Sequence, residues 1–321
     1  MTIVVGSDDD PQFMRMAFAA HQPRFGHITV HPTPLAGDAT HLAHDLIRSL
    51  GKHWPLPDGQ YNWLAQYGGT TQKWHLAAAW SLALGVNRVT VCRAHLLRLP
   101  KWHHLLAFSA RTGTRFTLVC NGPIPREVLP LIDTIAHRIV EGSGAAAEHW
   151  QTPTGLQELE GHSWWQHQAA FPPPDDEPWS RLPSQPRRRL IQRHRFQHAP
   201  AVQQPQVPAS RQAPYDLAVI ADRVHTRIAH PVFAACVAVQ ALTGHRTHHI
   251  PAFYEDSSIR FPFISPWSAL LMDAARCLQD VGGLPGISSR SLDAAQEDAD
   301  IDKALRDCRL STAQPAGQAP R

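Results

Sequence analysis

Short apolar runs alternate with helical patterns over the first 140 residues of the chain. Strand-like runs, rich in β-branched residues, cover residues 2–5, 27–31, 88–92 and 115–120. Apolar side chains recur at helical spacing in residues 13–21, 40–50, 71–84, 102–110 and 126–139. Because strands that alternate with helices of about 10 to 15 residues form βαβ units, residues 1–150 are predicted to be α/β, with a mostly parallel sheet and flanking helices.

The C-terminal part carries helical patterns and no strand-like run. They cover residues 216–229, 231–242 and 266–281, with a weaker acidic helix over 291–308. The pattern over 231–242 is apolar on every side, which is typical of a buried helix. We therefore expect an all-helical domain over residues 215–310 and a disordered tail over 311–321.

Residues 151–214 lie between these two parts and are rich in Trp, Pro and Arg. Much of the chain's high content of 28 prolines falls here, including a run of three at 172–174. From residue 168 to 214 the apolar content is too low to build a core. The stretch is predicted to be a largely disordered linker.

The composition of the chain excludes several classes of protein. The net charge of +3 is too small to indicate a partner, and the five cysteines include no CxxC pair that would suggest a zinc ribbon. No apolar stretch approaches the roughly 20 residues that span a bilayer, and the first residues lack the basic start of a signal peptide. We expect a cytoplasmic protein without a membrane partner.

The order of strand, glycine and helix at the start of the chain is that of a phosphate-binding loop. In the Walker A pattern, Gly and four further residues precede Gly, Lys and Ser or Thr. Here Gly6 leads to Pro11, Gln12 and Phe13 at those last three positions, so the flexible glycine, the cation and the hydroxyl ligand of Mg²⁺ are all replaced. The aspartates at 8–10 would repel a triphosphate. The loop is therefore predicted to bind no nucleotide, and no cofactor is expected.

Residues 89–97, with the sequence VTVCRAHLL, resemble the Walker B strand of the AAA+ ATPases that regulate transposition. In that family four apolar residues precede Asp-Glu, and Ala-His-Leu-Leu often follows. Cys92 and Arg93 stand at the two acidic positions, and Asn121 ends the next strand at a position like the family's sensor. Residues 28–50 also resemble that family's second strand and helix.

The resemblance covers roughly residues 1–140 and implies a P-loop-like fold. It also implies that the carboxylates that hold Mg²⁺ and orient the attacking water are both missing. The alternative is an unrelated α/β domain whose strands merely end in loops.

The linker holds the clearest positive feature. Between residues 181 and 211 there are seven arginines and no carboxylate. Flexible arginine-rich segments bind phosphate backbones without reading bases. The candidate nucleic-acid contacts are Arg187, Arg188, Arg189, Arg193 and Arg195. The alternative is a solvated linker without a partner.

Histidine is unusually frequent, with 21 copies. Three groups have spacings compatible with metal ligation on a helix: 41 and 44, 194 and 198, and 245, 248 and 249. None is joined to a cysteine or carboxylate cluster and HExxH is absent, so no metal is expected.

Together these features favour a non-enzymatic accessory protein of a mobile genetic element, which binds DNA or a nucleoprotein partner such as a transposase. The alternative is an enzyme of unrecognised type that uses a histidine-rich surface.

Overall fold

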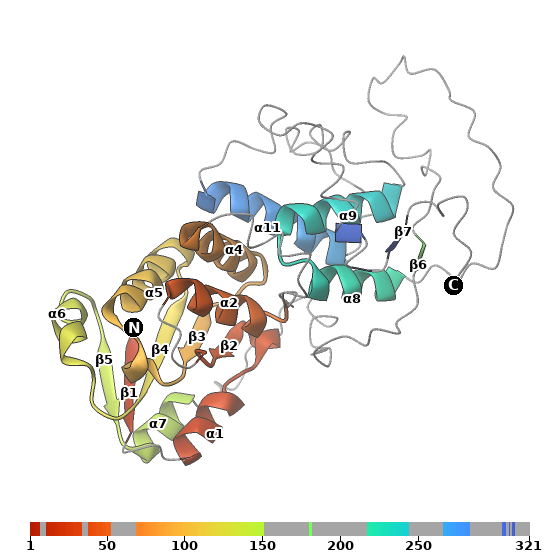
Figure 1. Ribbon diagram of the computed structural model, residues 1–321. Coiled ribbons are helices and arrows are strands. Elements are labelled where there is room, and N and C mark those ends of the chain that lie inside the picture. The colour runs from red at the N-terminus through yellow and green to blue at the C-terminus, as the bar shows by residue number, and fades with distance from the viewer. Residues whose placement is uncertain are drawn as a thin grey trace, which may run out of the picture.

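The computed structural model describes residues 1–6, 11–33, 38–52, 69–150, 180–181, 217–243, 266–282, 304–305, 308 and 310–311. Its centre is a five-stranded sheet in the order β2-β3-β4-β1-β5, in which every neighbouring pair is parallel (Figure 1). The strands are β1 (Thr2–Gly6), β2 (His27–Val30), β3 (Arg88–Val91), β4 (Arg115–Asn121) and β5 (Arg138–Glu141). The prediction of an α/β fold with a parallel sheet is confirmed.

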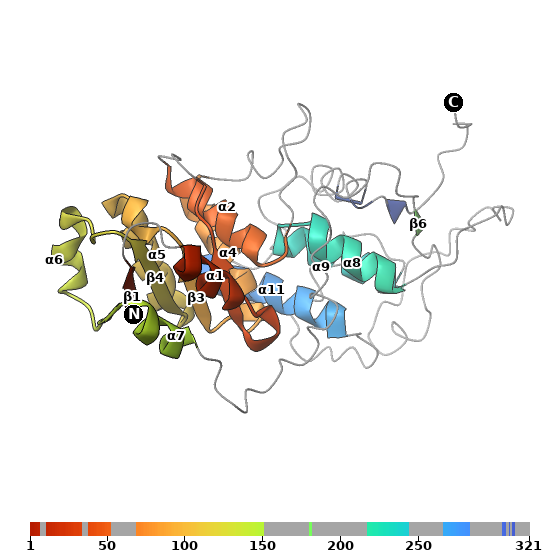
Figure 2. The same cartoon turned by 90° about the horizontal axis from the view of Figure 1, so that it is seen from below.

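Helices cover both faces of this sheet, as all-parallel sheets require. One face carries α1 (Pro11–Ala19) and α7 (Ser143–Trp150), which lie side by side in Figures 1 and 2. The other carries α2 (Ala39–Ser49), α4 (Thr70–Ala83) and α5 (Leu99–Thr112). Short helical turns complete the connections: η1 (Pro23–Phe25), η2 (Ala94–Leu96), η3 (Arg126–Val128) and α6 (Leu129–Ile132).

Alternation along the strands builds two separate cores. Ile3, Val89 and Leu118 point to the α2/α4/α5 face and are fully buried there. Val4 and Val119, one position further along, belong to the smaller core beneath α1 and α7. This period of two residues is what a sheet buried on both faces needs.

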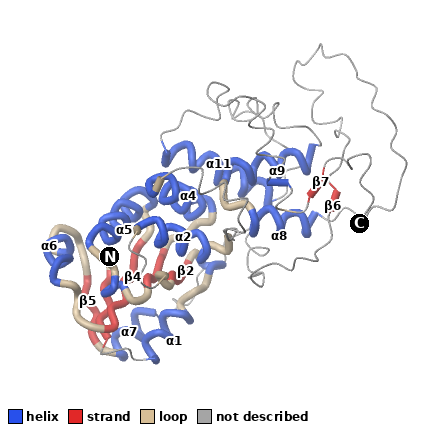
Figure 3. The backbone as a smooth tube through the Cα atoms, in the orientation of Figure 1, coloured by secondary structure: helices blue, strands red, loops and turns tan. Residues whose placement is uncertain are grey.

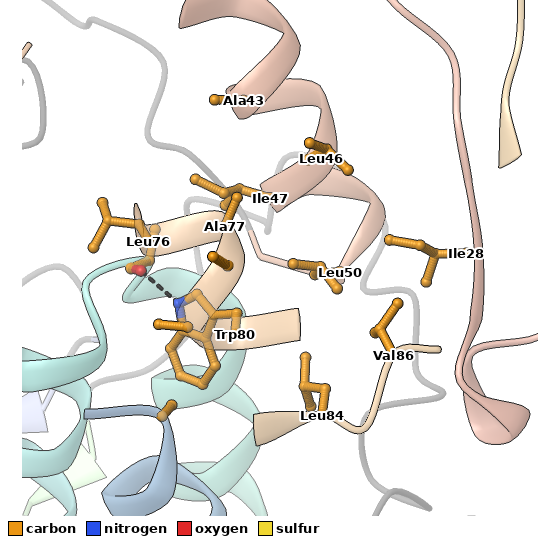
Figure 4. Close-up of a cluster of buried hydrophobic side chains, with 14 of the residues drawn as sticks. Ile28, Ala43, Leu46, Ile47, Leu50, Leu76, Ala77, Trp80, Leu84 and Val86 are labelled. Atoms are coloured by element: carbon orange, nitrogen blue, oxygen red, sulfur yellow. Dashed lines mark hydrogen bonds between the residues drawn. The ribbon is translucent and has the colours of Figure 1, made fainter. Parts of the chain in front are cut away.

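Helix α4 is buried over most of its middle, from Trp74 to Ser81, because it packs against more than one neighbouring helix. Its sequence WHLAAAW buries two tryptophans, Trp74 and Trp80. One side of the helix packs against α2, and α11 (Pro266–Gly282) lies along another side (Figure 1). Figure 4 shows the core between α2 and α4, where the Trp80 indole N–H donates a 2.7 Å hydrogen bond to the Ala229 carbonyl.

The C-terminal part contains helices, as predicted. These are α8 (Leu217–Arg227), α9 (Pro231–Thr243) and α11, and the buried residues of all three belong to the same core as α2 and α4. A two-residue strand β6 (Ser180–Arg181) pairs in parallel with β7 (Leu310–Ser311). Figure 3 shows the helices packed together beside the sheet.

The prediction of one helix over residues 126–139 is wrong. The structure has η3 and the single turn α6 there, and then the edge strand β5. Pro130 cannot donate within a helix, and the β-branched pair Ile139 and Val140 suits a strand. The helix α7 that follows was not predicted, because its SGAAAEHW sequence has little apolar periodicity.

Several predictions lie outside the described residues. They include most of the linker, with Arg187, Arg188, Arg189, Arg193 and Arg195, and most of the weak helix at 291–308. Within the described helices, none is long and apolar enough to cross a bilayer.

Candidate functional site

The carboxyl ends of the parallel strands meet at one edge of the sheet, and two neighbours there send the chain to opposite faces. After β1 the chain enters α1, which packs in the smaller core. After β4 it enters η3 and α6, whose Val128 and Ile132 belong to the larger core. Such a switch between adjacent strands is where open α/β sheets bind their ligands. The candidate site is therefore the position between the end of β1 and the end of β4.

Gly6 and Asn121 face each other across this switch point. They are paired in the register of β1 and β4, and each is the last residue of its strand. Asn121 is buried, with 6% of its surface exposed. The two residues singled out at Walker A and at the sensor position are thus brought together by the sheet.

Phe13 closes the space beside Gly6. A Cβ atom added to Gly6 would lie 3.2 Å from three atoms of the Phe13 ring. The ring is buried and meets Trp150 of α7 edge to face, with centroids 6.1 Å apart. Phe13 therefore packs in the core between α1 and α7, whereas a Ser or Thr hydroxyl there would serve a metal ion. Pro11 and Gln12 are the first two residues of α1.

Cys92, directly after β3, is buried in the same small core as Phe13 and Val119. Its backbone N–H donates a 2.9 Å hydrogen bond to the Val30 carbonyl, which prolongs the β2–β3 pairing. Burial raises the pKa of the Cys92 thiol to about 12, against a smaller opposing effect of Arg93. At neutral pH the group is an uncharged thiol, which is a poor ligand for Mg²⁺.

Arg93 makes the turn that leaves β3. Its φ of 51° is the one positive value among the non-glycine residues that the structure describes. This left-handed conformation costs roughly 1–2 kcal/mol for a residue with a Cβ atom. The turn leads into η2 and so places His95 toward the end of β4.

His95 connects the loop after β3 to the switch point. The backbone N–H of Asn121 donates a 3.1 Å hydrogen bond to His95 Nδ1, so this ring nitrogen carries no proton. Gly122 follows, and a Cβ atom there would lie 3.9 Å from His95 Cδ2. The sequence pointed to His95 only as part of the Ala-His-Leu-Leu motif and assigned it no role. It is the residue that ties the Walker B-like and sensor-like segments together.

The histidine groups do not form a metal site in the described part of the chain. The rings of His41 and His44 lie 6.2 Å apart on α2, and burial lowers the pKa of His44 to about 4. The other two groups lie outside the described residues. Among the residues that are described, no three His, Cys, Asp or Glu side chains could hold one metal ion.

No family model, curated protein or solved structure matches this chain. Function is therefore inferred from the residues at the switch point and from the distribution of charge. At the switch point the structure gathers Gly6, Phe13, Cys92, Arg93 and Asn121 around the ends of β1, β3 and β4. The residues gathered there are held by core packing and by the hydrogen bond between Asn121 and His95.

Proposed function

We propose that this chain is a non-enzymatic accessory protein on a P-loop-like fold that has lost nucleotide binding, and that it acts by binding DNA or a nucleoprotein partner. The observation that carries the proposal is the replacement of ligand groups by core packing at the switch point. Phe13 packs against Gly6, and Cys92 is a buried neutral thiol in the same core. A side chain that stabilises the fold in this way is not available to a phosphate or to Mg²⁺.

The order of the strands distinguishes this sheet from two other doubly wound folds. The strand before the phosphate-binding loop, β1, is separated by β4 from β3, which ends at the Walker B-like residues. The order differs from the dinucleotide-binding and flavodoxin-like sheets, in which β1 and β3 or β1 and β2 are neighbours. Fold alone does not assign function.

Binding to DNA is proposed from the charge of the linker. Seven arginines and no carboxylate lie between residues 181 and 211. A planar guanidinium bonds phosphate oxygens in pairs, which suits backbone contacts that do not depend on sequence. Regulators of transposition act on nucleoprotein complexes, so a transposase is the partner that the resemblance favours.

Titration calorimetry with Mg·ATP tests the loss of nucleotide binding. We expect no heat of binding at micromolar to millimolar ATP, both for the natural chain and for Asp9→Ala. Asp9→Ala removes one repelling charge but leaves the Walker A-like and Walker B-like positions without their Lys, Ser or Thr, Asp and Glu. It should therefore not restore ATP binding. Micromolar binding that Asp9→Ala leaves unaltered would show a working loop and would contradict the proposal.

A further inference from the structure

A row of basic side chains crosses the sheet near its amino edge, on the face that carries α1 and α7. In register, His27 of β2 pairs with Arg88 of β3, and Arg88 pairs with Arg115 of β4. Neighbouring strands are about 4.8 Å apart, so these three residues stand side by side on one face. Further along, Arg138 of β5 is in register with Thr2 of β1.

Arg138 lies on this same face. Thr2 is also in register with Thr117, and Thr117 is two residues beyond Arg115 on β4. Because side chains alternate with a period of two, all four residues point to the same side. The hydroxyl of Thr117 lies 3.0 Å from His149 Nε2 of α7, which confirms that this side is the α7 side.

The arginines of this row have no acidic partner in the described part of the chain. Arg115 and Arg138 are exposed, Arg88 is half-buried, and no carboxylate there forms an ion pair with any of the three. Burial, and then the charge of Arg115, lowers the pKa of Arg88. Burial, followed by Arg88 and Arg138, lowers the pKa of His149 in the same way. The cations of the row therefore repel one another.

The chemistry of the row suits phosphate better than a protein surface. No exposed large apolar side chain belongs to the row, and Thr90 and Thr117, the next residues of β3 and β4 on this face, are buried beneath it. Ile139, the exposed apolar residue of β5, alternates to the opposite face. The centres of protein interfaces combine arginine with large aromatic anchors, which the row lacks, whereas nucleic-acid backbones are bound largely through arginine and lysine.

We propose that Arg88, Arg115 and Arg138 form a second nucleic-acid contact, which binds the phosphate backbone across the amino half of the α1/α7 face. The inference rests on the proposed DNA binding and adds a surface on the folded part of the chain. A competing occupant is the chain's own stretch 151–179, which follows α7 and contains five carboxylates and no Lys or Arg. The experiment below separates the two.

The test compares paired substitutions in the full chain by fluorescence anisotropy with a labelled duplex of about 20 base pairs, at about 50 to 200 mM salt. Arg115→Gln with Arg138→Gln removes two exposed charges from the row. The matched control, Arg111→Gln with Arg126→Gln, removes two exposed charges carried by α5 and η3 at the other face. All of these side chains are exposed, so the fold should survive, and thermal unfolding checks this.

The log–log salt slope of the row variant should be less steep by about 2, because each phosphate contact contributes roughly −0.9 to the slope. At low salt the variant should bind at least about 10-fold more weakly. The control pair should change the slope by less than about 0.5. Equal effects of the two pairs, or an unchanged slope in the row variant, would overturn the inference. So would a lower melting temperature of the row variant with unchanged DNA binding, which would assign the row to the acidic stretch 151–179.

Failure of the inference is distinct from failure of the proposed function. Suppose that the natural chain binds the duplex, and that changing Arg187, Arg188 and Arg189 to Ala makes the salt slope less steep. If the row variant then keeps the natural slope, the inference alone is wrong. If the natural chain shows no binding at about 50 mM salt, DNA binding itself is wrong.

Discussion

The Nζ atom of Lys52 lies 2.6 Å from Nδ1 of His225, although the two residues are 173 positions apart. The same Nζ donates a 2.7 Å hydrogen bond to the His225 carbonyl and lies 3.5 Å from the centre of a Trp80 ring. Lys52 follows α2 and is buried, with 1% of its surface exposed. One lysine thus joins the α/β part of the chain to α8.

This buried amine should make stability depend on pH. Burial holds the pKa of Lys52 well below its ordinary value, so between the two values the unfolded chain binds a proton that the folded chain does not. The free energy of unfolding then rises with pH up to about 10.4. Lys52→Met should reduce this rise, measured by urea unfolding from about pH 7 to about pH 10. Lys73→Met, at a half-buried lysine of α4, is the control that removes a different lysine. Equal slopes in the natural chain and in Lys52→Met would contradict the prediction.

Phe13→Ala should cost about 3–4 kcal/mol of stability, because it removes a buried ring that packs against Gly6 and Trp150. Phe18 lies on the same helix with 51% of its surface exposed, so Phe18→Ala should cost less than about 1 kcal/mol. Denaturant unfolding of both variants measures the difference. Similar costs at the two positions would mean that Phe13 is not a core residue.

Acid should destabilise the fold through His27. Burial, followed by the charges of Arg88 and Arg115, lowers the pKa of His27 to about 4. The unfolded chain therefore takes up this proton first as pH falls from about 6.5, and stability is lost down to about pH 4. His27→Gln should reduce that loss. An NMR titration of the His27 ring with a midpoint near 6.5 would contradict this account.

Limited proteolysis should cut first between residues 168 and 214, where the sequence places arginines in a stretch of low apolar content. The two products should remain associated on size-exclusion chromatography, since α11 packs along α4 and Trp80 donates to Ala229. Separate elution of the fragments would contradict the packing, and resistance of the whole chain would contradict the predicted linker.

The sequence predicted the helices and strands whose apolar residues recur at a regular local spacing. It missed the elements that form only through pairing with distant parts of the chain. The apolar runs ending at Gly6 and Asn121 predicted two strands, and the sheet pairs them. Residues 126–139 were misread because Val128, Leu131 and Ile135 imitate a helix, while pairing with β1 makes a strand of the last residues. The β5 run RIVE is charged at both ends and buries only Val140, whereas the other edge strand, β2, is buried throughout and was predicted.

The same distinction holds for the candidate sites. Cys92 and Arg93 could be found from a contiguous motif, and the structure places them beside the switch point. The basic row of Arg88, Arg115 and Arg138 could not be found, because their sequence separation hides a proximity that only strand register creates. Each arginine alone looks like an ordinary strand terminus.

Duplex DNA binding by the full chain, measured over a range of salt with and without Mg·ATP, is the decisive test of a nucleotide-independent DNA-binding protein. We expect a log–log slope on the order of −6 to −7, from about five linker contacts and two or three contacts of the basic row, and the same slope with and without nucleotide. Changing Arg187, Arg188 and Arg189 to Ala should reduce it by roughly 3. Binding that requires Mg·ATP, or no binding at low salt, would contradict a nucleotide-independent DNA-binding protein.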